Sequence, residues 1–203
     1  MKKQRNSLLL AFVAVGAIFI ASCSKDDPQP EIPQEETHEA QLTFTEVEWQ
    51  DGQPVELEHP EVMVVTFEDG LAAVGTHIHL EAEKTYKVEL TAYDFAGREI
   101  QQEFVDDASV HQAFILGAPD GVLDYTYADP ADARVGVTGY LHVLQPSDGF
   151  VLNYILRHLN EGEKARITAG DWNNAQYTQF GGANDIDLKF EVHAVEAGHG
   201  HDH

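Results

Sequence analysis

The stretch "TYKVELTAY" (85–93) decides the fold class of this chain. Every second residue from Tyr86 to Ala92 is apolar, and the residues between them are charged or polar. Side chains of a β-strand point alternately to its two faces, so the apolar residues share one face. The pattern therefore predicts a half-buried strand of an antiparallel sheet.

Similar alternation runs through the chain from residue 40 to residue 196. Further strands are predicted at "QLTFTEV" (41–47), "VMVVTF" (62–67), "THIHL" (76–80), "VHQAFIL" (110–116), "VLDYTY" (122–127), "VTGYLHVL" (137–144), "GFVLNYILRHL" (149–159) and "DIDLKFEVHAV" (185–195). Turn-forming clusters such as "GAPDG" and "QPSDG" separate them, without a helical period. About nine such strands predict an all-β fold, a single antiparallel β-sandwich of immunoglobulin-like or Greek-key topology. A closed barrel is the alternative.

One long irregular stretch, residues 160–184, lies between the last two predicted strands. Loops of this length are usually functional or mobile. This one contains Trp172, Tyr177 and Phe180, and exposed aromatic rings can stack on sugars. The three rings are candidate glycan contacts, unless they only cover the edge of the sandwich.

The first residues predict a secretory signal. A basic start precedes an apolar run at 8–20, which is shorter than the roughly 20 residues of a membrane-spanning helix. The following "IASC" resembles the lipobox of bacterial lipoproteins, so residues 1–22 are the expected signal peptide and Cys23 the expected site of acylation. An ordinary signal peptide is the alternative.

Residues 23–39 are acidic and contain proline, which predicts an extended linker to the domain at 40–196. The "SKDD" after Cys23 resembles the signal that sends lipoproteins of Bacteroidota to the outer face of the outer membrane. We therefore expect a chain that is anchored in the lipid bilayer and faces the medium. Cys23 is the only cysteine, which excludes an intramolecular disulfide.

The formal net charge of −23 points to a cation as partner. Such a surface repels nucleic acid and anionic lipid, so no nucleic-acid partner is expected. Acidity also serves solubility, and by itself it favours a metal ion only slightly.

The chain has 11 histidines, and strand parity separates them. His77 and His79 fall on one face, opposite Ile78 and Leu80, and His193 likewise faces away from the apolar residues of its strand. These outward imidazoles are candidate ligands for zinc, or for copper or nickel. The alternative is that they are solvated side chains on a polar face.

The tail, residues 197–203, offers His199, His201 and His203 in the run "GHGHDH". Alternation with glycine and aspartate predicts a disordered segment that can wrap an ion, or else merely a polar ending. Because only neutral imidazole binds a metal, affinity should fall as the pH drops through about 6.5.

A possible second metal site involves His111 and His158. His158 shares the parity of Leu152, Tyr154 and Leu156, which predicts an inward position, whereas His111 has apolar neighbours on both parities. A single histidine among apolar residues is more often a hydrogen-bonded core residue than a ligand.

No catalytic motif is evident. The chain lacks a His-Glu-x-x-His zinc motif, a Gly-x-Ser-x-Gly elbow and a phosphate-binding glycine loop. We therefore expect no enzyme.

Several pieces together resemble a family of Bacteroidota surface lipoproteins, often labelled "type 1 periplasmic binding fold", that are associated with TonB-dependent receptors. The matching pieces are the opening strand "LTF" and the segments "KTYKVELTAYD", "ASVHQAFIL", "LDYTYADPAD", "GVTGYLHV", "FVLNYILRH" and "ANDIDLKFEV". The resemblance includes His111 and His158 but not the tail, and it implies a receptor partner and a link to metal uptake.

These observations lead to one hypothesis and two rivals. The hypothesis is a surface lipoprotein that binds a divalent transition metal, with zinc expected first, and assists its uptake through a TonB-dependent receptor. The rivals are a glycan-binding lipoprotein of a polysaccharide-uptake system and a purely structural or adhesive surface protein.

Overall fold

The computed structural model describes residues 36–68, 71–74 and 77–198. All described residues belong to one compact unit of the chain. The predicted signal peptide, Cys23 and the three tail histidines lie outside the described residues. No helix in the described part is long and apolar enough to cross a bilayer.

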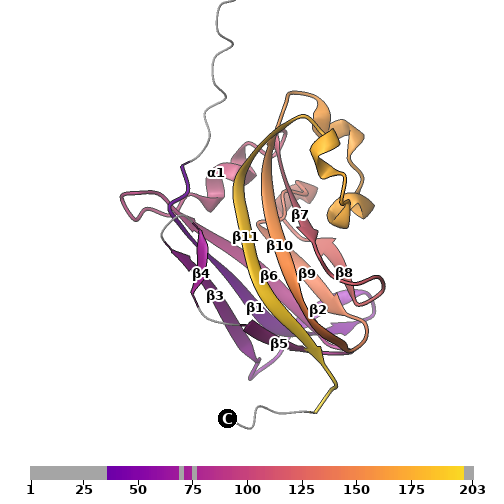
Figure 1. Ribbon diagram of the computed structural model, residues 1–203. Coiled ribbons are helices and arrows are strands. Elements are labelled where there is room, and N and C mark those ends of the chain that lie inside the picture. Colours follow the sequence, from indigo (N-terminus) through magenta and orange to yellow (C-terminus); the bar gives the residue numbers. More distant parts are fainter. Residues whose placement is uncertain (1–35, 69–70, 75–76, 199–203) are drawn as a thin grey trace, which may run out of the picture. The chain divides into compact units, whose positions relative to one another are not determined.

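The described residues form two β-sheets, which Figure 1 shows as two layers. The larger sheet has the order β4-β3-β1-β6-β9-β8, and β2 pairs with β1. Its strands are β1 (Glu39–Gln50), β2 (Gln53–Glu56), β3 (Val62–Glu68), β4 (Ala72–Val74), β6 (Thr85–Tyr93), β8 (Leu123–Tyr127) and β9 (Thr138–Val143). All of its pairs are antiparallel.

The smaller sheet has the order β5-β11-β10-β7. Its strands are β5 (His77–Glu81), β7 (His111–Leu116), β10 (Ser147–Leu159) and β11 (Gly182–Val195). Only β5 and β11 run parallel; the other pairs are antiparallel. The predicted all-β fold is therefore confirmed, with two sheets dominated by antiparallel pairing.

The core lies between the two sheets. The apolar face of "TYKVELTAY" is buried as predicted, from Tyr86 at 0% exposure to Ala92 at 0%. Phe44 of β1 and Phe67 of β3 contact Phe190 of β11 across the layers, at centroid distances of 5.9 and 6.0 Å. These rings join the two sheets into one apolar core.

Each predicted strand overlaps a strand of the structure, but the structure adds elements that the pattern missed. The strands β2 and β4 hold 4 and 3 residues, which is too short for an alternation to be recognised. The helix α1 (Gln101–Asp106) buries a single residue, Phe104, so it shows no helical period.

The long loop between β10 and β11 folds into three short 3-10 helices, η2 (Glu163–Arg166), η3 (Ala169–Asn173) and η4 (Tyr177–Gln179), beside β7 in Figure 1. A second apolar cluster lies beneath it and consists of Phe114, Leu159, Ile167 and Phe180. The loop therefore covers the outer face of the smaller sheet at β7 and the end of β10. This cover explains why residues 154–159 are all buried, on both faces of the strand.

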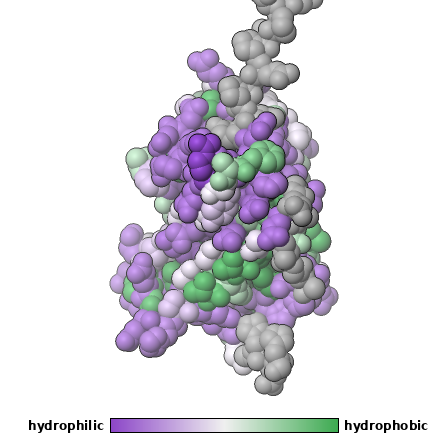
Figure 2. All heavy atoms as spheres, turned by 90° about the vertical axis from the view of Figure 1, so that its left-hand side faces the viewer, coloured by the Kyte–Doolittle hydropathy of each residue, from purple (hydrophilic) through white to green (hydrophobic). Residues whose placement is uncertain are grey.

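The side of the molecule that Figure 2 shows is mostly hydrophilic, with an apolar patch among the polar side chains. On the outer face of β3, Val62 and Val64 are exposed, opposite in parity to the buried Val65 and Phe67.

Candidate metal centre

Two buried histidines lie opposite each other on neighbouring strands. His111 of β7 and His158 of β10 are register partners, and their exposures are 0% and 8%. The distance between His111 Nε2 and His158 Nδ1 is 3.1 Å. His158 therefore points inward as predicted, and the ambiguity at His111 is resolved because it faces the same core.

The third member, Asp185, comes from an irregularity in β11. Leu156 pairs with Ile186 and Arg157 with Asn184, so Asp185 has no register partner on β10. Such a bulge turns a side chain away from the regular alternation. Here it brings Asp185 Oδ2 to 3.5 Å from His111 Nε2 and 3.8 Å from His158 Nδ1.

The carboxylate of Asp185 is buried without a hydrogen bond. Its side chain has 0% exposure, and neither carboxylate oxygen has a hydrogen-bond partner. Burying a charged group in this way is costly unless an opposite charge compensates it. A cation bound between Asp185 and the two imidazoles would supply that charge.

The separations of the three atoms suit a transition-metal ion. A tetrahedral zinc ion with bonds of about 2.0–2.1 Å holds its ligand atoms roughly 3.3 Å apart. The three observed distances, 3.1, 3.5 and 3.8 Å, lie around that value. Three ligands leave a fourth position open, and the 10% exposure of the His158 side chain places the centre just below the surface.

The helix α1 orients the first ligand. His111 Nδ1 lies 3.0 Å from the carbonyl oxygen of Asp107, the residue that caps α1. Because a carbonyl can only accept, Nδ1 carries the proton and Nε2 directs its lone pair toward the centre. The ring of Phe104 packs against His111 at a centroid distance of 5.2 Å.

Two nearby basic residues donate their hydrogen bonds to other groups than Asp185. Arg157 donates to the carbonyls of Phe180 and Gly182 and to Asn184 Oδ1. Burial lowers the pKa of Arg157, although the charge of Asp185 works against this shift. The Lys164 ammonium donates to three backbone carbonyls, one of them that of His111, and burial lowers the pKa of Lys164 to about 8. Both side chains fasten the long loop onto the sheet.

The outward histidines also come together. His77 and His79 of β5 lie beside His193 of β11, and we call these three residues the outer-face histidines. Their ring centroids are 4.9, 4.9 and 5.3 Å apart. The predicted outward orientation agrees with their surroundings, because Leu80 of the opposite parity is fully buried.

The candidate glycan contacts are placed differently from the expectation. Trp172 and Phe180 are 7% and 5% exposed, so the expectation of exposed rings is wrong for both. The loop folds back on the sheet and carries them into the two apolar clusters. Tyr177 is half-buried: its hydroxyl oxygen accepts a hydrogen bond from Asn184 at 3.3 Å, and Arg157 lies over its ring.

Asp185 is the functional residue that the pattern did not reveal. In a regular strand it would share the parity of Asp187 and Lys189, on the solvent side. The only local sign of a bulge is the preceding "GGAN", in which Gly182 has φ +137° and approaches the carbonyl of His158. A side chain could not fit there, since its Cβ would lie 2.0 Å from that oxygen.

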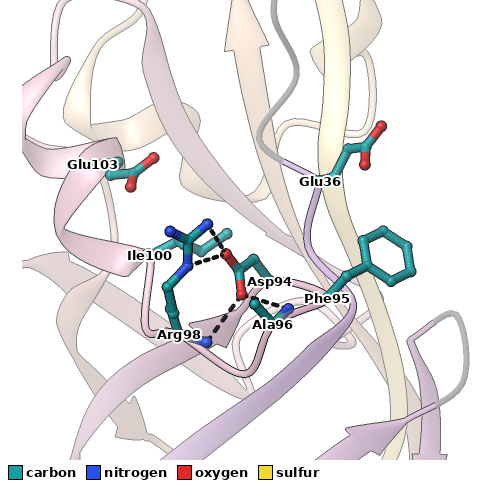
Figure 3. Close-up of a pocket in the computed structure, with 7 residues that line it drawn as sticks. All are labelled: Glu36, Asp94, Phe95, Ala96, Arg98, Ile100 and Glu103. Carbon is teal, nitrogen blue, oxygen red and sulfur yellow. Dashed lines mark hydrogen bonds and ion pairs between the residues drawn. The ribbon is translucent and has the colours of Figure 1, made fainter.

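A pocket of about 370 Å³ lies around the turn at Asp94, away from the candidate metal centre (Figure 3). Its carboxylate accepts hydrogen bonds from the backbone amides of Ala96 and Arg98, and the Arg98 guanidinium folds back onto it. These bonds to Arg98 lower the pKa of Asp94. Unlike Asp185, this carboxylate needs no further partner.

Comparison with known proteins adds no family. No protein-family model matches the chain, and no curated protein matches it significantly. The chain is similar to the crystal structure of domains 4 and 5 of the S-layer protein SbsC, with 10% identity and a TM-score of 0.31 over 82% of this chain and 74% of that one. A structure of domains 4–9 of surface layer protein SbsC gives 11% identity and a TM-score of 0.31, over 84% of this chain and 23% of that one. Both similarities are too distant to inform the site.

Proposed function

We propose that this chain is a non-enzymatic metal-binding protein that holds a divalent transition metal, zinc first, between His111, His158 and Asp185. The observation that carries the proposal is the buried Asp185 carboxylate, which has no hydrogen bond and faces two imidazole nitrogens. Two nitrogen ligands favour zinc, copper or nickel over calcium and magnesium, which prefer oxygen.

Binding is proposed in place of catalysis on the basis of the sequence. Three protein ligands with an open position also occur in catalytic zinc sites. The chain, however, carries neither a His-Glu-x-x-His zinc motif nor a Gly-x-Ser-x-Gly elbow.

The cellular setting is proposed from the sequence. The "IASC" box and "SKDD" support a lipid anchor at Cys23 in the outer membrane, with the domain facing the medium. The family resemblance supports delivery of the ion to a TonB-dependent receptor. A net charge of −23 draws cations to the surface and so favours capture.

Calorimetric titration of Zn²⁺ into the metal-stripped chain from Ser24 onward tests the centre, with a competing chelator so that only tight binding is seen. Asp185→Asn keeps the shape of the side chain but removes its charge. We expect the affinity for zinc to fall by at least about 10-fold. The matched control is Asp187→Asn, because Asp187 lies on the same strand with its own ion pair to Lys189. Equal affinity in the wild type and in Asp185→Asn would refute the centre.

Thermal unfolding gives a second readout of the same variants. A ligand that binds only the folded state stabilises it, by about 2.7 kcal/mol at 100 times its dissociation constant. We expect zinc to raise the melting temperature of the wild type and of Asp187→Asn much more than that of Asp185→Asn. In chelator, Asp185→Asn should melt at or above the wild-type temperature, because it removes a buried carboxylate that accepts no hydrogen bond.

A further inference from the structure

We propose that the outer-face histidines, His77, His79 and His193, form a second transition-metal site, with Glu191 as the residue that orients His193. The inference rests on the proposed function for the class of ion, but the site shares no ligand with the buried centre. It lies on the opposite face of the same sheet and is open to solvent.

The parallel pairing of β5 with β11 creates the group. It places His79 beside His193 and His77 beside Glu191. His77 and His79 are two residues apart and therefore share a face of β5. Three imidazoles and one carboxylate thus meet on the outer surface, although two of the imidazoles lie more than a hundred residues from the third.

The ring spacing matches a shared ion. In a tetrahedral zinc site, each nitrogen lies about 2 Å from the metal and each ring centre about 1 Å further, so the centroids of three imidazoles are roughly 5 Å apart. The observed centroid distances are 4.9, 4.9 and 5.3 Å. Binding of one ion by all three imidazoles requires their rings to rotate about χ2, a torsion with a broad minimum.

Glu191 selects the nitrogen that His193 offers. Its Oε1 lies 2.9 Å from His193 Nε2. A carboxylate accepts hydrogen bonds, so in this contact His193 Nε2 carries the ring proton and donates a hydrogen bond to Glu191. His193 Nδ1 then keeps its lone pair for the metal, as in the carboxylate-histidine-zinc arrangement. Both side chains remain accessible, with exposures of 34% for His193 and 48% for Glu191.

A bulge in β10 makes room for the His193 ring. Ser147 pairs with Ala194 and Phe150 with Val192, so Asp148 and Gly149 together lie opposite His193. A Cβ at Gly149 would be 2.7 and 2.8 Å from His193 Cε1 and Nε2, and 3.0 Å from Glu191 Oε1. The ring and its carboxylate partner therefore occupy the space that any larger residue would take.

The test uses residues 24–198, which keep every described residue and omit the three tail histidines. Zn²⁺ is titrated calorimetrically, without chelator, into this chain carrying Asp185→Asn, and histidine ring signals are followed by NMR. We expect one remaining zinc site, which broadens or shifts the ring signals of the outer-face histidines. Adding His79→Gln should abolish it, and adding Gly149→Ala should weaken it at least about 10-fold by displacing the His193 ring.

The control is His142→Gln, which removes an imidazole from the larger sheet and should leave this binding unchanged. Binding in the Asp185→Asn chain that survives both His79→Gln and Gly149→Ala would overturn the inference. If Asp185→Asn alone abolishes all zinc binding, the buried centre stands and the outer site does not. If Asp185→Asn changes nothing whereas His79→Gln removes binding, the outer site stands and the proposed centre fails.

Discussion

At the scale of single residues, the partners of a carboxylate separate a candidate site from ordinary structure. Asp94 accepts hydrogen bonds from two backbone amides and the Arg98 guanidinium, so its charge is compensated within its own turn. Asp185 is buried and accepts none, and nitrogens of two imidazoles lie 3.5 and 3.8 Å from its Oδ2. The cost of that burial is what a bound cation would remove.

A second residue gives the fold a dependence on pH. Burial lowers the pKa of His142 on β9, although Asp124 on the paired strand β8 works against this shift. The unfolded chain then takes up this proton at a higher pH than the folded chain, so stability falls as the pH drops below about 6.5. Thr85 Oγ1 contacts His142 Nδ1 at 3.0 Å.

His142→Gln keeps a polar group near Thr85 but cannot take up a proton. Urea unfolding in chelator at pH 7.5 and pH 5.5 should therefore show a smaller loss of unfolding free energy in this variant than in the wild type. The same loss in both proteins would show that His142 does not carry the effect.

At the scale of elements, both candidate sites occur at irregularities of the β10–β11 pair. Near one end, the extra residue of β11 is Asp185, which turns toward the two buried histidines. Near the other end, Asp148 and Gly149 of β10 lie opposite His193. A bulge re-aims side chains without ending a strand, so one pair of strands can carry ligands at two places.

The long loop is a second element whose role the structure changes. Trp172 of η3 belongs to the main core and lies 6.1 Å from the ring of Tyr125. Trp172→Ala should therefore lower the unfolding free energy by about 3–5 kcal/mol in urea denaturation. For the exposed Phe95, Phe95→Ala should stay within about 0.5 kcal/mol. A folded Trp172→Ala protein of unchanged stability that failed to bind polysaccharide would favour the glycan hypothesis instead.

At the scale of the whole molecule, the smaller sheet carries both candidate metal sites. Its inner face holds the buried centre, and its outer face holds the histidines of β5 and β11. The strand β11 contributes to both, through Asp185 and His193. The two proposed sites differ in exposure, since the His158 side chain is 10% exposed and that of His193 is 34% exposed.

The proposed anchor also belongs to this scale. Cys23→Ser removes the only thiol that could be acylated, so the chain should no longer incorporate labelled palmitate and should leave the membrane fraction. Mass spectrometry of the mature N-terminus checks the same point. A Cys23→Ser chain that remained membrane-bound would contradict the lipoprotein assignment.

The sequence by itself determined the strands other than β2 and β4, and the outward direction of His77, His79 and His193, because the two-residue alternation of a strand is a local property. It also indicated an inward His158. Only the tertiary structure decided that β5 lies parallel to β11, that α1 orients His111, and that Trp172 and Phe180 are buried. Asp185 was hidden for the same reason: a bulge depends on how two strands pair across the sheet, and no local pattern encodes that register.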